Sequence, residues 1–167
     1  TTPHVRLDTA DYRALLLSDA PMMDVRAPVE FAEGSFPSAR NLPLLSDDER
    51  HQVGICYKES GQAEAIELGK TFLTGDVKAE RFKKWNEFIT TNPDHGYLDC
   101  VRGGRRSQSV QQGIQAETGI RYPLVTGGYK AMRRFLLDEL DHSLDAGNAK
   151  LILVSGKTGT GKTRLID

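Results

Sequence analysis

The chain has 167 residues, of which 38% are hydrophobic and 27% charged, a balance that lets a globular domain fold without disulfides or metal. Its net charge of −1, from 22 basic and 23 acidic residues, argues against a protein that attracts nucleic acid through overall charge. The two cysteines form no CxxC pair, and the histidines do not cluster at metal-ligand spacing. Neither a signal peptide nor an apolar run of membrane-spanning length is apparent. The composition therefore predicts a cytoplasmic protein with no metal site and no membrane partner.

The first part of the chain is predicted to alternate short strands and short helices. The expected elements are an edge strand at 5–7, a helix at 11–17 capped by Thr9, a buried strand at 21–25, a helical turn at 29–32 after Pro28, and a strand at 39–42. Strand, helix and strand at this spacing predict an α/β fold with a parallel sheet flanked by helices. Asp24 and Arg26, at the end of a strand, are predicted to form an internal ion pair.

The middle of the chain is predicted to be helical. Ser46 and Glu49 form a capping box for a helix that runs to about Lys58, and Gly61 separates it from a second helix at 63–73. A third helix, at 79–90, carries apolar residues at three- and four-residue spacing, including Trp85. We expect Trp85 to be a core residue and not a platform on which nucleic-acid bases stack.

The sequence CVRGGRRS at 100–107 follows a short strand predicted at 96–99 and leads into a helix that begins near Arg106. Glycines in the loop let the backbone turn sharply, and the helix directs its positive end to the same place. Arginine charge there would hold an anion, and Cys100 would be a nucleophilic thiolate at the floor of the loop. The predicted binding residues are Arg102, Gly103, Gly104, Arg105, Arg106 and Ser107. The alternative is that Cys100 is a buried structural cysteine.

Asp99 precedes this cysteine, and a carboxylate facing the sulfur would oppose its ionisation. Because side chains alternate along a strand, we expect Asp99 to point away from Cys100.

Further elements of the first domain are predicted after the loop. They are a helix at 107–117 closed by Gly119, a strand at 122–125, a turn at Gly127 and Gly128, and a helix from 129 to about 144. Ala146, Gly147 and Asn148 mark a boundary, so residues 1–146 are predicted to form the first domain.

A second phosphate-binding motif follows an apolar strand predicted at 150–155. The sequence GKTGTGKT fits the P-loop pattern G-x-x-x-x-G-K-[ST], whose residues are Gly156, Lys157, Thr158, Gly159, Thr160, Gly161, Lys162 and Thr163. Lys162 would reach the outer phosphate, and Thr163 would hold Mg²⁺. Because the chain ends at Asp167, residues 147–167 are predicted to be the truncated start of a P-loop domain whose C-terminal part is missing, with no NTPase activity of its own.

Two resemblances to known proteins accompany these motifs. The segment 24–44, DVRAPVEFAEGSFPSARNLPL, resembles a rhodanese domain, and the cysteine loop resembles the rhodanese active-site loop. A rhodanese-like domain joined to a P-loop resembles the tRNA 2-selenouridine synthase family, whose hallmarks are matched by DDERHQVGICYK at 47–58, CVRGGRRS at 100–107 and PLVTGGYKAMR at 123–133.

This resemblance implies a transferase of selenium that acts on tRNA. Family members replace the sulfur of wobble 2-thiouridine by selenium from selenophosphate, and they transfer a geranyl group to that sulfur. It implies that Cys100 is essential and that the P-loop binds a phosphate, such as the diphosphate of geranyl diphosphate; no further cofactor is firmly implied. The implied partners are tRNA and an enzyme that supplies selenophosphate. Selenophosphate is a tetrahedral anion, and the loop, with five residues between cysteine and arginine, is longer than the usual rhodanese loop.

Other functions remain open on the sequence alone. A rhodanese-type sulfurtransferase would use the same loop, and C-x5-R is also the nucleophile loop of phosphatases and arsenate reductases. Those enzymes use an aspartic acid to protonate the leaving group, and the sequence offers no clear candidate close after the loop. A nucleotide-binding module built on the P-loop is a further alternative.

Overall fold

The structure is a computed structural model that describes residues 5–145, 152–161, 163 and 164. The chain divides into two compact units, Thr1–Arg134 and Phe135–Asp167. This division falls within the last long helix, whereas the domain boundary predicted at 146–148 lies outside the described residues and stays a prediction.

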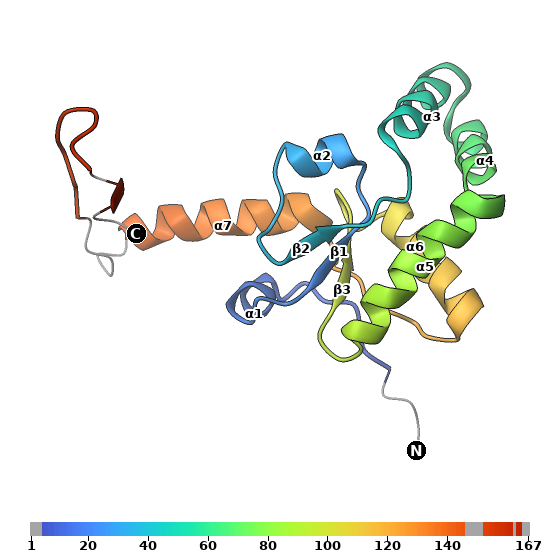
Figure 1. The fold of residues 1–167 in the computed structure, drawn as a ribbon, viewed down its shortest axis with the longest axis horizontal. Helices are drawn as coiled ribbons and strands as arrows, with labels where there is room; N and C mark the ends of the chain where they lie inside the picture. Colours follow the sequence, from blue (N-terminus) through green and yellow to red (C-terminus); the bar gives the residue numbers. More distant parts are fainter. Residues whose placement is uncertain (1–4, 146–151, 162, 165–167) are drawn as a thin grey trace. The chain divides into compact units, whose positions relative to one another are not determined.

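Ten elements follow one another along the described chain (Figure 1). They are α1 (Tyr12–Leu17), β1 (Met22–Asp24), α2 (Pro28–Ala32), β2 (Ala39–Asn41), α3 (Asp47–Ser60), α4 (Gln62–Phe72), α5 (Gly75–Thr91), β3 (Tyr97–Asp99), α6 (Arg105–Thr118) and α7 (Gly128–Asp145). No helix among the described residues is long and apolar enough to cross a membrane.

The sheet is parallel and has the strand order β2-β1-β3, so the predicted α/β fold with a helix-flanked parallel sheet is confirmed. In this register Asp24 lies opposite Asn41 on one side and Asp99 on the other. Single parallel bridges continue the sheet beyond β3, from Leu98 to Leu124 and from Val125 to Thr9. The carboxyl ends of β1 and β3 therefore meet at one edge, where ligand sites of open parallel sheets form.

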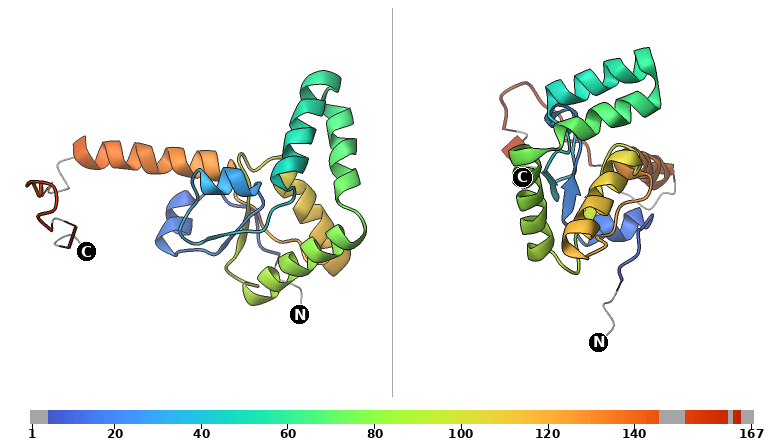
Figure 2. Two further views of the ribbon diagram at one scale, coloured as in Figure 1. Left: turned by 45° about the horizontal axis from the view of Figure 1, so that its top comes forward. Right: turned by 90° about the vertical axis from the view of Figure 1, so that its right-hand side faces the viewer.

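Helices cover both faces of the sheet (Figure 2). On one face, Met23 and Leu98 pack with Trp85 and Phe88 of α5 and with Val110 of α6. On the other face, Met22 packs against Leu15 of α1 and Met132 in the first turns of α7. The alternation of strand side chains thus sends neighbouring residues of β1 and β3 into different cores.

Some local predictions were wrong. Residues 5–7 form no strand, and the side chain that caps α1 is Asp11, which accepts a hydrogen bond from the Ala14 N–H at 3.0 Å. Thr9 instead accepts from the Asp11 N–H. Residues 122–125 contribute only isolated bridges, and residues 152–155 are not in a strand, although an apolar run had indicated one. Short apolar runs pair as strands only where a neighbouring backbone is available.

The helical middle of the chain was predicted well. The Ser46–Glu49 capping box is present at the start of α3, and Gly61, with φ of 94°, separates α3 from α4. These two helices lie side by side as a hairpin (Figures 1 and 2).

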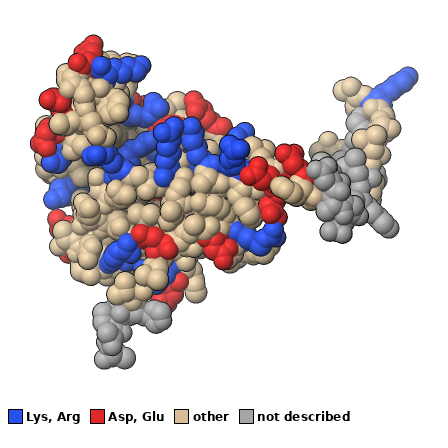
Figure 3. All heavy atoms as spheres, turned by 180° about the vertical axis from the view of Figure 1, so that it is seen from behind, with Lys and Arg blue, Asp and Glu red and all other residues tan. Residues whose placement is uncertain are grey.

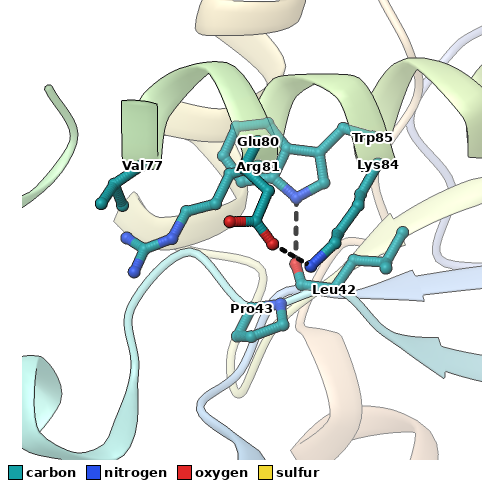
Figure 4. Close-up of a pocket in the computed structure, with 7 residues that line it drawn as sticks. All are labelled: Leu42, Pro43, Val77, Glu80, Arg81, Lys84 and Trp85. Atoms are coloured by element: carbon teal, nitrogen blue, oxygen red, sulfur yellow. Dashed lines mark hydrogen bonds and ion pairs between the residues drawn. The ribbon is translucent and has the colours of Figure 1, made fainter. Parts of the chain in front are cut away.

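Trp85 is a core residue, as predicted. Its side chain is 1% exposed, and its indole N–H donates to the Leu42 carbonyl at 3.0 Å. It lines a cavity of about 290 Å³ in which Lys84 and Glu80 are paired with each other (Figure 4). The remaining cation of this cavity, Arg81, binds the Leu44 carbonyl and Glu49. The charges around the indole are thus already neutralised.

Candidate active site

The cysteine loop lies where the sequence predicted it, between β3 and α6. We call residues 100–107 the cradle. Its strand is fixed because the Val25 N–H donates to the Asp99 carbonyl at 2.9 Å, which places Cys100 at the carboxyl end of the sheet. The helix begins at Arg105, one or two residues earlier than predicted, and Gly104 is its N-cap residue.

The backbone of the cradle has unused hydrogen-bond donors. Within the described residues, no acceptor takes the N–H groups of residues 102–107, and Gly104 provides no side-chain cap for α6. Uncapped amides at a helix N-terminus, together with the positive end of the helix dipole, favour a bound anion. The unused amides are the donors that the predicted anion site needs, and the binding of an anion there stays a prediction.

A second glycine pair, Gly127 and Gly128, forms the wall behind the cradle. Gly103 has φ of 61° and Gly128 has φ of 63°, a region that favours glycine. A Cβ atom on Gly128 would lie 2.2 Å from the Cys100 carbonyl oxygen and 2.5 Å from the Gly103 nitrogen. Tyr129 N–H donates to the Cys100 carbonyl at 2.9 Å, and Lys130 N–H donates to the Val101 carbonyl at 3.0 Å. The start of α7 thus holds the loop by backbone contact, for which only glycine leaves room.

Cys100 lies at the floor of the cradle, as predicted, but its side chain is 2% exposed and belongs to the apolar core. The thiol donates to the Ser107 hydroxyl at 3.2 Å, and that hydroxyl donates to the Gly104 carbonyl at 3.0 Å. Ser107 is therefore the polar group that contacts the sulfur from within the cradle. The sulfur is less accessible than the sequence suggested because Cys100, directly after β3, faces the same core as Leu98.

The arginines of the cradle have different roles. Arg106 binds Glu30 of α2 through two hydrogen bonds, at 2.6 and 3.1 Å, so its guanidinium group already holds a carboxylate. Arg102 and Arg105 are exposed, and within the described residues neither has an acidic partner. Arginine and lysine side chains gather in a band across the face shown in Figure 3. Exposed Lys130, bonded through its backbone to the cradle, adds to the basic character around the loop.

A buried polar cluster lies beneath the cradle. Asp24 and Arg26 form the predicted ion pair, at 2.6 Å, and both are buried. Asp99 lies opposite Asp24, on the face away from the Cys100 sulfur, as strand alternation predicted. Burial, and then the charge of Asp24, raise the pKa of Asp99 to about 8, although Arg26 opposes this change. Asp99 therefore carries its proton at neutral pH and does not place a negative charge beside the sulfur.

Sequence reasoning did not assign a site role to Glu30 or Tyr129. Glu30 joins Arg106, the Ala27 N–H and Arg50, at 2.6, 3.1 and 3.2 Å, and these charges hold the pKa of Glu30 below its usual value against the effect of burial. The Tyr129 ring lies under the Arg26 guanidinium, 4.0 Å from its centroid. Two features of the sequence could have indicated these roles. Glu30 is an acidic residue inside the segment 24–44, and Tyr129 is an aromatic residue directly after Gly127 and Gly128.

The P-loop residues lie apart from the cradle in sequence, in the second compact unit. Residues 156–161 are exposed and contain a turn in which the Thr160 hydroxyl donates to the Lys157 carbonyl at 2.8 Å. Gly159 and Gly161 have φ of 86° and 80°, a region that favours glycine. Thr163 is exposed, and Lys162 lies outside the described residues.

Comparison with curated proteins gives extensive matches. The chain is 58% identical to a tRNA 2-selenouridine synthase of Marinobacter nauticus, 56% to that of Cupriavidus pinatubonensis and 55% to that of Azotobacter vinelandii, over 96–97% of its length. The chain is a homologue of the tRNA 2-selenouridine synthases. It corresponds to the N-terminal part of the family members and spans about 43% of their length. No family model matches the chain.

A solved structure shares the fold. It is described as the N-terminal domain of a "putative ATP/GTP binding protein" from Clostridium difficile 630, with a TM-score of 0.63 and 31% sequence identity. The match covers 78% of this chain and 98% of the solved domain. Most of this chain therefore resembles a domain that has been solved separately.

Proposed function

We propose that the chain is the part of a tRNA 2-selenouridine synthase that binds the selenium donor. The whole protein would replace the sulfur of wobble 2-thiouridine in tRNA by selenium from selenophosphate, after a geranyl group has been transferred to that sulfur. The relatives' name supports the tRNA product, and the segment 24–44 with the cradle supports a rhodanese-like fold adapted to a phosphorus-centred anion.

The observation that carries this proposal is the set of unused amides at residues 102–107 around the Cys100 and Ser107 pair. The three oxygens of a selenophosphate would accept these N–H groups, which would direct its selenium toward the sulfur at the floor. Arg102 and Arg105 would add charge from the rim. Arg106 would act indirectly, by holding α2 against the cradle through Glu30.

The chemistry favours a positioning role for Cys100. Selenium in selenophosphate is fully reduced, so taking it onto Cys100 as a perselenide would require an oxidant. Direct attack of the donor selenium on C2 of the base requires none. The C2–S bond then breaks, the geranylthiolate leaves with the electron pair, and water cleaves the Se–P bond to release phosphate. The Cys100 thiol would orient the donor during this attack.

The P-loop would bind the diphosphate of the prenyl donor. Lys162 would neutralise the outer phosphate, and the Thr163 hydroxyl would hold Mg²⁺, which would neutralise further phosphate charge when bound. Gly159 and Gly161 have the backbone conformation that such a turn uses.

A direct test uses the protein that carries this chain, selenophosphate, and either tRNA with 2-thiouridine plus geranyl diphosphate or tRNA with geranylated 2-thiouridine, followed by mass analysis of the nucleosides. Cys100→Ser is expected to abolish formation of 2-selenouridine from both tRNAs, whereas Cys56→Ser, at a half-buried position on α3, is the matched control. Retention of selenium incorporation by Cys100→Ser would refute the role of the cradle. Thiosulfate:cyanide sulfur transfer and p-nitrophenyl phosphate hydrolysis, measured in parallel, test the sulfurtransferase and phosphatase alternatives.

A further inference from the structure

An apolar cavity lies beside the cradle, at the base of the α3–α4 hairpin. Its volume is about 260 Å³, and its walls include Leu44, Leu45, Val53, Ile66 and Leu73. The hairpin contributes little to the main core, because α3 has no buried residue and α4 has only Ala65. Leu44 and Leu73 also pack against the main core, whereas the side that the hairpin contributes lies open; apolar side chains around an open cavity indicate a binding site for an apolar group.

One side of this cavity is positively charged. Arg105 and Arg106, from the first turn of α6, line it together with the apolar residues, so the cavity and the cradle share two side chains. Glu30 neutralises Arg106, whereas Arg105 has no acidic partner among the described residues. A ligand that fits both the apolar walls and the arginine side of the cavity has an apolar chain. One end of that chain carries an anionic group or is attached to a polyanion.

The volume limits the length of this chain. A cavity of about 260 Å³ lies near the lower end of the range for small-molecule sites, which suits a short branched hydrocarbon and not a helix of a partner protein. We infer that the cavity binds the geranyl chain of the substrate while the cradle holds the selenium donor. This inference rests on the proposed function and gives that function a prenyl-binding site in the N-terminal part of the enzyme.

The geranyl chain has two sources, free geranyl diphosphate and the geranylated base of tRNA. Binding to the 167-residue chain is measured for four probes: geranyl diphosphate, inorganic diphosphate, an anticodon stem-loop with geranylated 2-thiouridine, and the same stem-loop without the geranyl group. A geranylated probe is expected to bind at least about tenfold more tightly than its partner without the chain, since burial of several methylene-sized groups stabilises the complex. The pair of probes with the larger difference in affinity shows whether the cavity binds the geranyl chain of geranyl diphosphate or that of tRNA.

Two glycines provide matched variants. Gly69 of α4 lines the cavity, and a Cβ atom added there would lie no closer than 3.9 Å to Val53 Cγ2, so Gly69→Leu fills the cavity without a clash at Cβ. Gly54 of α3 is exposed, has no atom within 4 Å of such a Cβ and does not line the cavity, so Gly54→Leu is its control. Both substitutions favour helix. Gly69→Leu is expected to remove most of the preference for geranylated probes and to leave diphosphate binding unchanged, whereas Gly54→Leu changes neither.

Equal binding of geranylated and plain probes would overturn the prenyl site and leave the cradle proposal intact, provided that selenium incorporation still depends on Cys100. If Gly69→Leu keeps the preference for geranylated probes, the prenyl site is also overturned. A melting curve of each variant shows that the fold is kept. If Arg105→Gln no longer binds the anionic probes but still incorporates selenium normally, that result would instead count against the cradle as the site of the selenium donor.

Discussion

Arg106 of α6 reaches Glu30 of α2 through two hydrogen bonds, and this pair closes the outer side of the cradle. Glu30 also accepts from the Ala27 N–H, so one carboxylate connects the turn after β1 with the helix that follows Cys100. The guanidinium group of Arg106, one of the predicted anion-binding residues, thus also acts as a clamp between α2 and α6, and its contact with an anion stays a prediction.

The clamp leads to a prediction on stability and pH. Glu30→Gln is expected to lower the free energy of unfolding by about 1–3 kcal/mol, because Arg106 would be left without its carboxylate. Since the pKa of Glu30 is lowered in the folded state, its contribution is present above the usual glutamate pKa and is lost as the pH falls below it. Urea unfolding between about pH 3 and 7 should show the difference between the two proteins shrinking toward acid. An equal difference at all pH values would argue against the ion pair. Glu64→Gln, at an exposed position on α4, is the control.

Asp99 predicts a pH dependence of the opposite sign. Its pKa is raised in the folded state to about 8, because burial and the charge of Asp24 outweigh the opposing effects of Arg26 and of nearby backbone N–H groups. Folding therefore favours the protonated acid, and this stabilisation, complete below the unfolded pKa near 4, is lost as the pH rises toward 8. Asp99→Asn is expected to flatten the stability curve between about pH 4 and 8, by a few kcal/mol at most. Thermal melts across that range check this, and a variant that keeps the original slope would show that another group titrates.

Gly128 makes a prediction about backbone packing. Gly128→Ala is expected to destabilise the fold by roughly 2 kcal/mol or more and to distort the cradle, because its Cβ would collide with the Cys100 carbonyl and the backbone has positive φ. Gly104→Ala is the comparison within the same loop, since its φ is −99° and no atom lies within 4 Å of an added Cβ. Chemical denaturation of the two variants measures the difference, and equal stability would contradict the wall formed by Gly127 and Gly128.

The basic residues at the rim lead to a prediction about tRNA binding. Lys130→Gln is expected to weaken binding of tRNA by the protein that carries this chain and to reduce the salt slope of log K by about one. Lys84→Gln is the control, since Lys84 is exposed but paired with Glu80 at 2.6 Å. Fluorescence anisotropy at several salt concentrations provides the slopes. A change of the same size in both variants would place the tRNA surface elsewhere.

The sequence by itself determined the positions of most helices and of the cradle, because these depend on local signals. Helix caps, glycines with positive φ and the run from Cys100 to Ser107 act within a few residues, and α3, α4 and α6 follow from them closely. The internal pairing of Asp24 with Arg26 was also predictable, since two opposite charges beside a buried strand need each other.

Only the tertiary structure decided which groups face the site. The contacts of Arg106 with Glu30, of Gly128 with Cys100, and of Asp99 with Asp24 each join residues from different elements, and sheet register and helix packing set their distances. The strand predicted at 122–125 was reduced to single bridges for the same reason, since strand pairing requires a neighbouring backbone that local sequence does not specify. Local chemistry therefore indicated the anion site, whereas the packing of distant segments determined which of its amides and charges remain free for a ligand.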